Sequence, residues 1–491
     1  MKSSIIKDKS YAFALRTITL AGWLKAQKEF EIAGQILRSG TAIGSNVEEA
    51  LAGVSRADFI AKMSIASKEA RETHYWLRLL RDSKIITESR ITLLENESLE
   101  LIRILTAIVK TTQSNGANSK LKTKNLMVLP INAALKNLPV YQPGRPIEEV
   151  ARELGLPAET IIKLASNENP FGPSPLALAA MQKALAGVNL YPDGNAFYLK
   201  QKLAGKLGVE PAHLIFGNGS NEIIEFIGHA LLAPGTDVIV SQYCFAVYPI
   251  VTRLFGANLI TVPAKNYRHD LAAMLRAITP QTRIVFVANP NNPTGTLAPR
   301  EEVIRFVNDV PDNVLLVIDE AYLDFLDDPL DLSPLVRLGT RSNLILMRTF
   351  SKIHGLAGLR IGYGIGNVEL IAALEKIRQP FNLNLLAQTA ALAALDDVEH
   401  VRKTRANNFA GLKFFEQAFR SLKLDYVPSH ANFILVRVGN GQRVFESLQK
   451  QGVIVRSMGG YQLPEWIRIS IGTPPENERC LGALKSILGQ K

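Results

Sequence analysis

The sequence predicts a multidomain protein in which an all-α four-helix bundle precedes an α/β region built on a mostly parallel sheet. The first 115 residues contain no proline and carry apolar residues at helical spacing. Beyond residue 126, proline and glycine become frequent, and short β-branched runs alternate with helical segments. A polar segment at about residues 116–126 is predicted to be a linker between the two parts.

Length and composition set the broad class of this chain. Its 491 residues are 47% hydrophobic and 21% charged, which is typical of a soluble globular protein with two to four domains. No apolar run approaches the roughly 18–20 residues of a membrane helix. Cys244 and Cys480 are the only cysteines, so neither a disulfide framework nor a clustered metal site is expected. We therefore expect a cytoplasmic protein that binds no metal.

The net charge of +11 is concentrated near the N-terminus. Residues 1–126 hold 20 Lys and Arg against 13 Asp and Glu, which accounts for +7 of the total. This excess is interpreted as a solvated helix surface rather than an RNA-binding patch, so nucleic acid is not expected as a partner.

Four helices are predicted in the first part, at about residues 6–28, 31–53, 56–84 and 88–112. In the third helix, apolar or small residues alternate steps of four and three, and they form one stripe from Phe59 to Leu80. Ser55 is the expected N-cap of that helix, with Asp58 three residues later. Short connections favour an antiparallel up-down bundle over residues 1–115.

The bundle resembles the intervening-sequence four-helix-bundle proteins of bacteria. The resemblance covers residues 5–112 and is carried by residues 35–49 and 59–77. It implies a fold and a tendency to form oligomers but little chemistry. His74, Tyr75 and Trp76 are accordingly interpreted as packing or interface residues.

The strands of the second part are predicted to be buried on both faces of a sheet. They lack polar alternation, as in the runs at 214–216, 238–240, 283–287, 314–318 and 344–347. Ligands of such sheets bind beyond the carboxyl ends of the strands, and the polar motifs of this chain lie there.

Three of these motifs could surround a planar anionic cofactor. The turn Gly217–Glu222 opens a helix whose free N–H groups could hold an anion, although an ordinary strand–helix turn explains it equally well. Tyr243 follows a strand and could stack on a flat ring or pack in the core. Asn292, in a loop fixed by two prolines, could offer its amide to a phenolic oxygen.

Two further motifs carry charge. Asp319 ends a buried strand and requires a cationic or donor partner, and Tyr322 could reach the same ligand. Ser351 and Lys352 follow another strand, and Lys352 could act as a nucleophilic amine if its charge is disfavoured. Arg360 could supply the nearby cation or bind a phosphate.

In this order, the motifs resemble those of the fold-type-I aminotransferases, over about residues 130–490. Within that group the chain is similar to the histidinol-phosphate aminotransferases, on residues 138–146, 163–174, 191–194 and 453–461. The resemblance implies pyridoxal 5′-phosphate bound covalently to Lys352, with Lys352, Asp319 and Tyr322 as catalytic residues. The implied cofactor-binding residues are Ser220, Asn221, Tyr243, Asn292, Asp319, Tyr322, Ser351, Lys352, Arg360 and, from a second subunit, Tyr191.

The resemblance also implies how substrates bind. Arg468 would bind the α-carboxylate of glutamate, and Arg456 and Tyr141 the phosphate of histidinol phosphate, with Asn167 and Glu168 lining the same site. Ser457 replaces a proline common in the family, which weakens the assignment of Arg456. The N-terminal bundle is a larger difference from the family, whose ordinary members lack it.

The reaction expected is L-histidinol phosphate + 2-oxoglutarate = imidazole acetol phosphate + L-glutamate, a step of histidine biosynthesis. The aminotransferase part is placed at 127–491, with a large domain at about 170–378 and a small domain at about 127–169 and 379–491. We expect a homodimer through this part, with further oligomerisation through the bundle left open. Three alternatives remain: an aromatic amino-acid aminotransferase, a phosphothreonine decarboxylase of the same branch, and a scaffold or RNA-associated bundle carrying an enzyme.

Overall fold

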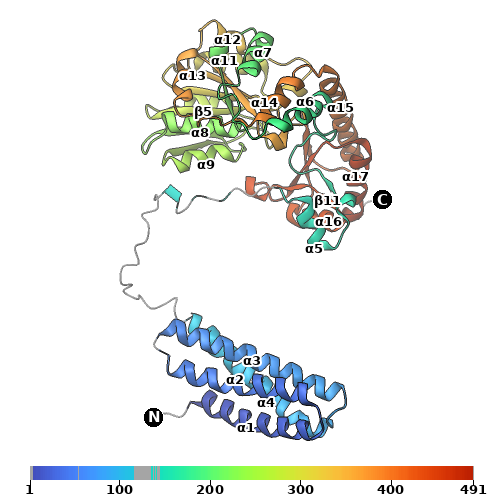
Figure 1. The fold of residues 1–491 in the computed structure, drawn as a ribbon. Helices are drawn as coiled ribbons and strands as arrows, with labels where there is room; N and C mark the ends of the chain where they lie inside the picture. The colour runs from blue at the N-terminus through green and yellow to red at the C-terminus, as the bar shows by residue number, and fades with distance from the viewer. Residues whose placement is uncertain are drawn as a thin grey trace. The chain divides into compact units, whose positions relative to one another are not determined.

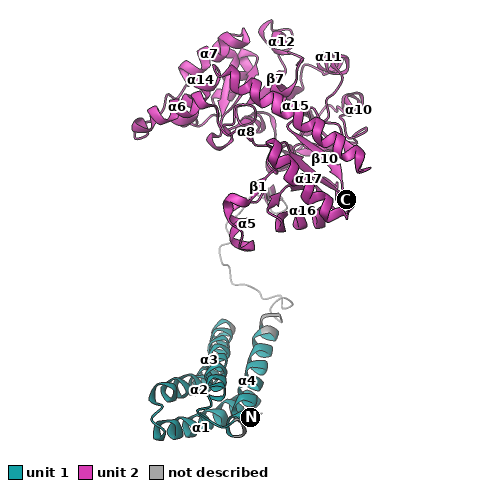
Figure 2. Ribbon diagram, turned by 90° about the vertical axis from the view of Figure 1, so that its right-hand side faces the viewer, with its two compact units in different colours: residues 1–129 teal, residues 130–491 magenta. Residues whose placement is uncertain are grey.

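The computed structural model describes residues 4–53, 55–114, 134–135, 138, 140 and 144–489. The chain forms two compact units, Met1–Leu129 and Pro130–Lys491 (Figure 2). The predicted linker at 116–126 and the predicted substrate residue Tyr141 lie outside the described residues. Within the described ranges, every helix is too short or too polar to cross a membrane.

The N-terminal unit is the predicted four-helix bundle (Figure 1). Each helix packs against the next, and the first also packs against the last, which closes the bundle. The Ser55 hydroxyl accepts a hydrogen bond of 3.1 Å from the backbone N–H of Asp58, as expected of an N-cap. The helices are α1 Ile5–Ala26, α2 Phe30–Leu51, α3 Arg56–Asp82 and α4 Glu88–Ser114.

The predicted stripe of α3 faces the core of the bundle. Its members from Met63 to Leu80 are fully buried, and Phe59 is partly buried against them. The buried polar groups are mostly small hydroxyls that bond to one another or to helix carbonyls; Thr73 Oγ1, for example, donates to Ser39 Oγ at 2.9 Å. His74 Nδ1 lies 2.9 Å from the Ser98 hydroxyl. The bundle is thus held by apolar packing, and its buried hydroxyls are satisfied locally.

The C-terminal unit is built on a seven-stranded sheet of order β2-β8-β7-β6-β5-β3-β4. All neighbouring strands are parallel except β8, which is antiparallel to both β2 and β7. The mostly parallel sheet was predicted, although β4 and β8 were not. Its strands are β2 Leu214–Gly217, β3 Asp237–Ser241, β4 Asn258–Val262, β5 Thr282–Ala288, β6 Leu315–Asp319, β7 Leu344–Thr349 and β8 Gly362–Gly366.

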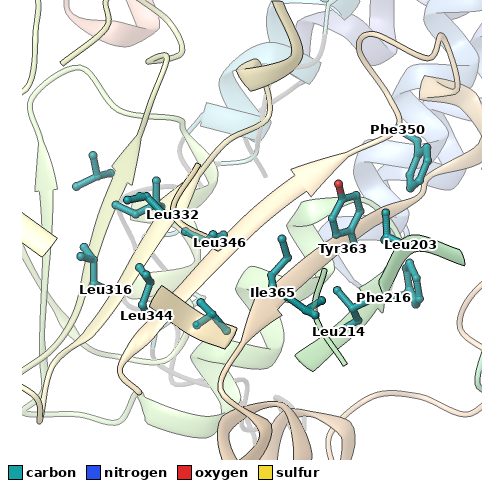
Figure 3. Close-up of a cluster of buried hydrophobic side chains, with 14 of the residues drawn as sticks. Leu203, Leu214, Phe216, Leu316, Leu332, Leu344, Leu346, Phe350, Tyr363 and Ile365 are labelled. Carbon is teal, nitrogen blue, oxygen red and sulfur yellow. The ribbon is translucent and has the colours of Figure 1, made fainter. Parts of the chain in front are cut away.

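Both faces of the sheet are covered by helices, which explains why its strands lack polar alternation. Successive residues of one strand enter different clusters: Leu316 and Ile318 of β6 belong to one, and Leu315 and Val317 to the other. Figure 3 shows part of the first cluster, around Leu346 and Tyr363. Helices α8 Ser220–Leu231 and α9 Val247–Leu254 cover one face, and α11 Arg300–Asp309 and α12 Ser333–Arg337 the other (Figure 1).

A second, antiparallel sheet has the order β12-β13-β10-β9. Its core is shared with helices α15 Val398–Ser421, α16 Gly441–Lys450 and α17 Pro474–Leu488. A separate parallel pair joins β1 Ile162–Lys163 to β11 Val453–Ile454. The strands are β9 Tyr426–Val427, β10 Phe433–Arg437, β12 Arg456–Ser457 and β13 Trp466–Ser470.

The remaining helices complete the unit around the large sheet. The alanines of α14 are buried in the same cluster as the sheet residues, and α14 packs against α6. This packing favours a boundary between large and small domains near the start of α15, later than residue 378, and the division itself stays a prediction. These helices are α5 Ile147–Leu154, α6 Pro175–Ala184, α7 Phe197–Leu207, α10 Leu271–Arg276, α13 Val368–Glu375 and α14 Leu385–Ala394.

Candidate active site

A cavity of about 270 Å³ lies at the carboxyl ends of β5, β6 and β7. This is where ligands bind in open α/β sheets. The cavity brings together residues that are far apart in the sequence. The predicted site residues that line it are Asn167, Glu168, Ser220, Asn221, Asn292, Asp319, Tyr322, Ser351, Lys352, Arg360, Arg456 and Arg468.

Lys352 enters the cavity from the loop after β7. Its Nζ donates to the Ser166 carbonyl at 3.1 Å and lies 5.7 Å from the centre of the Tyr322 ring. Burial, followed by the positive charge of Arg468, lowers the pKa of the Lys352 amine to about 8. A substantial fraction of this amine is therefore neutral near physiological pH, as a nucleophile or a proton acceptor requires.

Asp319 is the last residue of β6 and is almost fully buried. Its Oδ1 accepts from the Ala321 N–H at 3.1 Å, and its Oδ2 accepts from the Tyr248 hydroxyl at 2.7 Å. Burial raises the pKa of the Asp319 carboxyl, while these two donors and the Lys352 charge act against the increase. The arrangement presents a buried acceptor at the floor of the cavity.

Strand β13 supplies a cation and the support for a strained asparagine. Arg468 Nη1 donates to Asn292 Oδ1 at 2.7 Å, and Nη2 donates to the Ala165 carbonyl at 2.9 Å. Two residues further along the same face, the Ser470 hydroxyl donates to Asn167 Oδ1 at 3.0 Å. Asn167 has a φ of +56°, and its Nδ2 donates to the Tyr322 hydroxyl at 2.9 Å. Strand β13 thus supplies Arg468 to the cavity and, through Ser470 and Asn167, fixes the Tyr322 hydroxyl.

The turn before α8, which could hold an anion, also lines the cavity. Ser220 and Asn221 open α8, where the first N–H groups have no intrahelical partner. Gly219 precedes them with a φ of +72°, and a Cβ there would lie 2.5 Å from Arg360 Nη2. A Cβ on Gly362 would lie 2.5 Å from the Ser220 nitrogen. Both glycines are therefore required for the close approach of the helix terminus and the Arg360 guanidinium.

Arg456 and Arg468 are partners in register on the adjacent strands β12 and β13. Directly opposite residues of antiparallel strands project to the same face, and both arginines line the cavity. Glu168 lines the same cavity, and its Oε1 accepts from Lys163 Nζ at 2.8 Å. The cavity is therefore lined by two neighbouring guanidinium groups, Arg456 and Arg468, in addition to Arg360.

The structure corrects the prediction for Tyr243, which does not line the cavity. Its ring stacks on Tyr267, with centroids 5.8 Å apart, in the cluster that contains Leu435 and Trp466. Phe245, two residues later, is the aromatic residue of this segment at the cavity wall. The prediction relied on the position of Tyr243 just after β3 in the sequence. The conformation of the turn between β3 and α9 instead determines which aromatic side chain faces the cavity.

Tyr191 lies on the surface of this subunit. It is 84% exposed and stacks on Phe381, with ring centroids 4.8 Å apart. A contribution of Tyr191 to the site of a second subunit stays a prediction.

The sequence did not predict the roles of three aromatic side chains at the site: Phe245 and Tyr461, which line the cavity, and Tyr248, which donates to Asp319. A buried tyrosine needs a partner for its hydroxyl, and this requirement was the signal available for Tyr248. The sequence did not show which group would supply that partner.

Comparison with known proteins shows the family of the C-terminal unit. Residues 159–484 match the family model for aminotransferase class I and II. The chain belongs to this aminotransferase family. The histidinol-phosphate aminotransferase of Akkermansia muciniphila is 54% identical over 358 residues, which cover 73% of this chain and 98% of the relative. Histidinol-phosphate aminotransferase 2 of Ralstonia nicotianae is 52% identical over 354 residues, covering 71% and 95%.

Solved structures of aminotransferases share the fold of the C-terminal unit. Histidinol-phosphate aminotransferase from Sinorhizobium meliloti, in complex with pyridoxal-5′-phosphate, matches with a TM-score of 0.68 and 29% identity, covering 74% of this chain and 98% of that structure. The putative enzyme from Erwinia carotovora atroseptica matches with a TM-score of 0.64 and 28% identity, covering 67% and 96%. The predicted family, the fold class and the transaminase activity are confirmed.

The N-terminal unit matches a second family. Residues 2–107 match the model described as 23S rRNA-intervening sequence protein. The predicted fusion of a helical bundle with an aminotransferase is confirmed.

Proposed function

We propose that the C-terminal unit, as a histidinol-phosphate aminotransferase, transfers the amino group between L-histidinol phosphate and 2-oxoglutarate in histidine biosynthesis. The observation that carries this proposal is the in-register pair Arg456 and Arg468, which lines the same cavity as Lys352. A substrate pair in which one member has an α-carboxylate and the other a phosphate needs two such cationic groups.

The residues of the cavity fit pyridoxal phosphate. Asp319 offers a buried acceptor to a ring N–H, Phe245 offers an aromatic wall, and the glycines beside α8 let the Arg360 guanidinium approach the helix N-terminus, where the two together could hold a phosphate. Lys352 would carry the cofactor covalently through Nζ. When bound, the cofactor supplies an electron-withdrawing ring that stabilises negative charge at the substrate Cα. The other proposed contacts are Asn292 and Tyr322 to the phenolic oxygen, and Ser220, Asn221, Ser351 and Arg360 to the phosphate.

Lys352 would move the proton at the substrate Cα. General acid–base catalysis is most effective when the pKa of the group lies near the working pH, and the pKa of Lys352 is lowered to about 8. Asp319, held as an acceptor, would keep the proton on the ring nitrogen. Tyr322, bonded to Asn167 at 2.9 Å, would donate its hydroxyl hydrogen to the phenolic oxygen.

Substrate binding would use the β12–β13 face. Asn292 and the Ala165 carbonyl fix both terminal nitrogens of Arg468, so its guanidinium has one orientation toward an α-carboxylate. Arg456 would bind the phosphate of histidinol phosphate, with Asn167 and Glu168 beside the rest of the substrate. Tyr141 is proposed as a further phosphate ligand by resemblance alone.

Steady-state kinetics with different amino donors test this function. We expect kcat/KM for L-histidinol phosphate to exceed that for phenylalanine and tyrosine by at least about 100-fold, because only the phosphate pairs with Arg456. Arg456→Gln should remove most of this preference, while the exposed control Arg402→Gln should leave it unchanged. A preference for the aromatic amino acids would instead identify an aromatic aminotransferase.

We also propose that the chain is a cytoplasmic homodimer through its aminotransferase unit. Support comes from exposed apolar side chains around Tyr191, among them Leu190, Tyr198 and Phe381. Exposed Tyr11, Leu15 and Ile18 along α1 support a further contact through the bundle. Light scattering of the full chain, and of a chain with all three α1 residues changed to serine, separates the two contacts. A monomeric full chain would refute the dimer.

A further inference from the structure

Asp319 depends on a residue outside the cavity. Its side chain is only 6% exposed, so its negative charge is poorly solvated and must be stabilised by donors from the protein. The Ala321 N–H reaches Oδ1 at 3.1 Å, and the Tyr248 hydroxyl reaches Oδ2 at 2.7 Å. The shorter of these bonds comes from the one donor that is a side chain, and its geometry can be changed by mutation without altering the backbone.

Tyr248 is held rigidly by the core. It is fully buried in the first turn of α9, and its ring lies parallel to Phe286 of β5, with centroids 4.5 Å apart and an interplanar angle of 4°. Phe245 packs edge-on against it at 5.7 Å. Burial raises the pKa of the Tyr248 hydroxyl well above its usual value, so this hydroxyl remains a donor at every physiological pH. Because the ring is packed on these sides, the Tyr248 hydroxyl points toward Asp319 and donates its hydrogen there.

The short segment from Phe245 to Tyr248 thus contributes to two parts of the site. Phe245 lines the cavity wall, while Tyr248 lies beneath the floor, and the Tyr248 N–H donates to the Phe245 carbonyl at 3.1 Å. The ring that would cover a flat cofactor and the hydroxyl that supports its carboxylate partner are therefore fixed relative to each other.

We propose that Tyr248 is a positioning residue whose hydroxyl keeps Asp319 an oriented acceptor for the ring nitrogen of the cofactor. This inference rests on the proposed function. Without the hydroxyl, Asp319 loses a donor in a buried site and takes up a proton more readily. A protonated Asp319 would donate to the ring nitrogen instead of accepting from its N–H, and the nitrogen would lose its positive charge.

The experiment compares two cofactors on the full chain prepared without cofactor. One is pyridoxal phosphate, and the other is its 1-deaza analogue, in which C–H replaces the ring nitrogen. In Tyr248→Phe we expect the affinity for pyridoxal phosphate to fall roughly 10- to 100-fold, the effect of losing a hydrogen bond to a charged group. The affinity for the deaza analogue should stay unchanged, because that ring has no N–H from which Asp319 could accept a hydrogen bond.

The control is Thr252→Val, which removes the hydrogen bond from Thr252 Oγ1 to the Tyr248 carbonyl on the same helix. It should leave both affinities unchanged. Asp319→Asn supplies a second measurement: once the carboxylate is gone, adding Tyr248→Phe should cost no further affinity for pyridoxal phosphate.

The outcomes separate this inference from the proposed function. Four outcomes would assign the hydroxyl a merely structural role and overturn the inference. They are equal losses of affinity for both cofactors, no loss for either, an added loss in the Asp319→Asn background, and failure of Tyr248→Phe to fold. A wild-type chain that binds neither cofactor would instead refute the proposed function.

Discussion

The two units of this chain place their buried polar groups in opposite ways. In the bundle these groups are mostly hydroxyls such as Thr73 and Ser39, which bond to each other or to the helix backbone. In the aminotransferase unit, the buried charges of Asp319 and Arg468 line one cavity, while the buried carboxylate of Glu320 pairs with Arg348 at 2.7 Å. Burying a charge is costly unless it is used or paired, so the contrast separates a unit built for packing from a unit built for chemistry.

Glu95 is the exception within the bundle. It is 7% exposed and pairs with Arg81 at 2.9 Å. This single paired carboxylate between two helices differs from Lys352, Asp319 and Arg468, which line one cavity together, because Glu95 does not line the bundle cavity between α1 and α4.

The largest effect should come from removing the amine of Lys352. Lys352→Ala deletes both the proposed attachment point and the group that moves the Cα proton, so turnover should fall by at least about 10⁴-fold. Single-turnover assays with L-histidinol phosphate measure this loss. Lys413→Ala, on the exposed face of α15, is the control and should keep the wild-type rate. Wild-type turnover by Lys352→Ala would refute the assignment.

Arg468 should rank second. Arg468→Ala removes the proposed α-carboxylate ligand, and we expect kcat/KM for glutamate to fall roughly 10²- to 10³-fold, as two charge-assisted hydrogen bonds are lost. Arg468→Lys keeps the charge but not the planar fork, so most of the loss should remain. The matched control is Arg437→Ala on the neighbouring strand β10, where the side chain is exposed. A change below threefold in Arg468→Ala would show that glutamate binds elsewhere.

The cost of burying Lys352 should be visible in stability. Its folded pKa of about 8 lies below the ordinary value of 10.5, so between these values the unfolded chain binds more protons and stability rises with pH. Without cofactor, Lys352→Met should be more stable than wild type by about 3 kcal/mol below pH 8. This advantage should disappear as the pH rises toward 10.5. Calorimetry of the aminotransferase transition measures it, and an advantage independent of pH would exclude a charged buried amine.

The smallest effect on catalysis should come from the bundle core. Leu77 is fully buried in α3, and Leu77→Ala should reduce the free energy of unfolding of the bundle by about 3 kcal/mol. Because the bundle contributes no residue to the proposed chemistry, kcat/KM for L-histidinol phosphate should change by less than twofold. A tenfold decrease would show that the two units are coupled.

The sequence predicted the elements of this molecule better than their precise contacts. Lys352, Asp319 and Asn292 line one cavity, because strand ends of a parallel sheet meet at one edge, and their roles there stay predictions. Strand β8 was missed since glycines occupy three of its five positions, and at Gly362 the closeness of the Ser220 nitrogen excludes a side chain. Glycine is unfavourable for strands by propensity, so only the tertiary contact explains it.

The directions of side chains in loops also could not be predicted from the sequence. Tyr243 and Phe245 are both aromatic and both follow β3, and no local pattern distinguishes the one that packs on Tyr267 from the one at the cavity. The Tyr248–Asp319 hydrogen bond joins residues 71 positions apart, and it appears only when α9 packs on the sheet. Contacts of this kind depend on tertiary packing, which sequence periodicity does not contain.

The central claim is that all of the chemistry belongs to the aminotransferase unit. The most direct test is kcat/KM for L-histidinol phosphate with 2-oxoglutarate, measured for the full chain and for a chain that begins at Met127. We expect values within twofold of each other, and both chains should lose activity in Lys352→Ala. A shortened chain that folds and binds pyridoxal phosphate but is at least tenfold less active would contradict it.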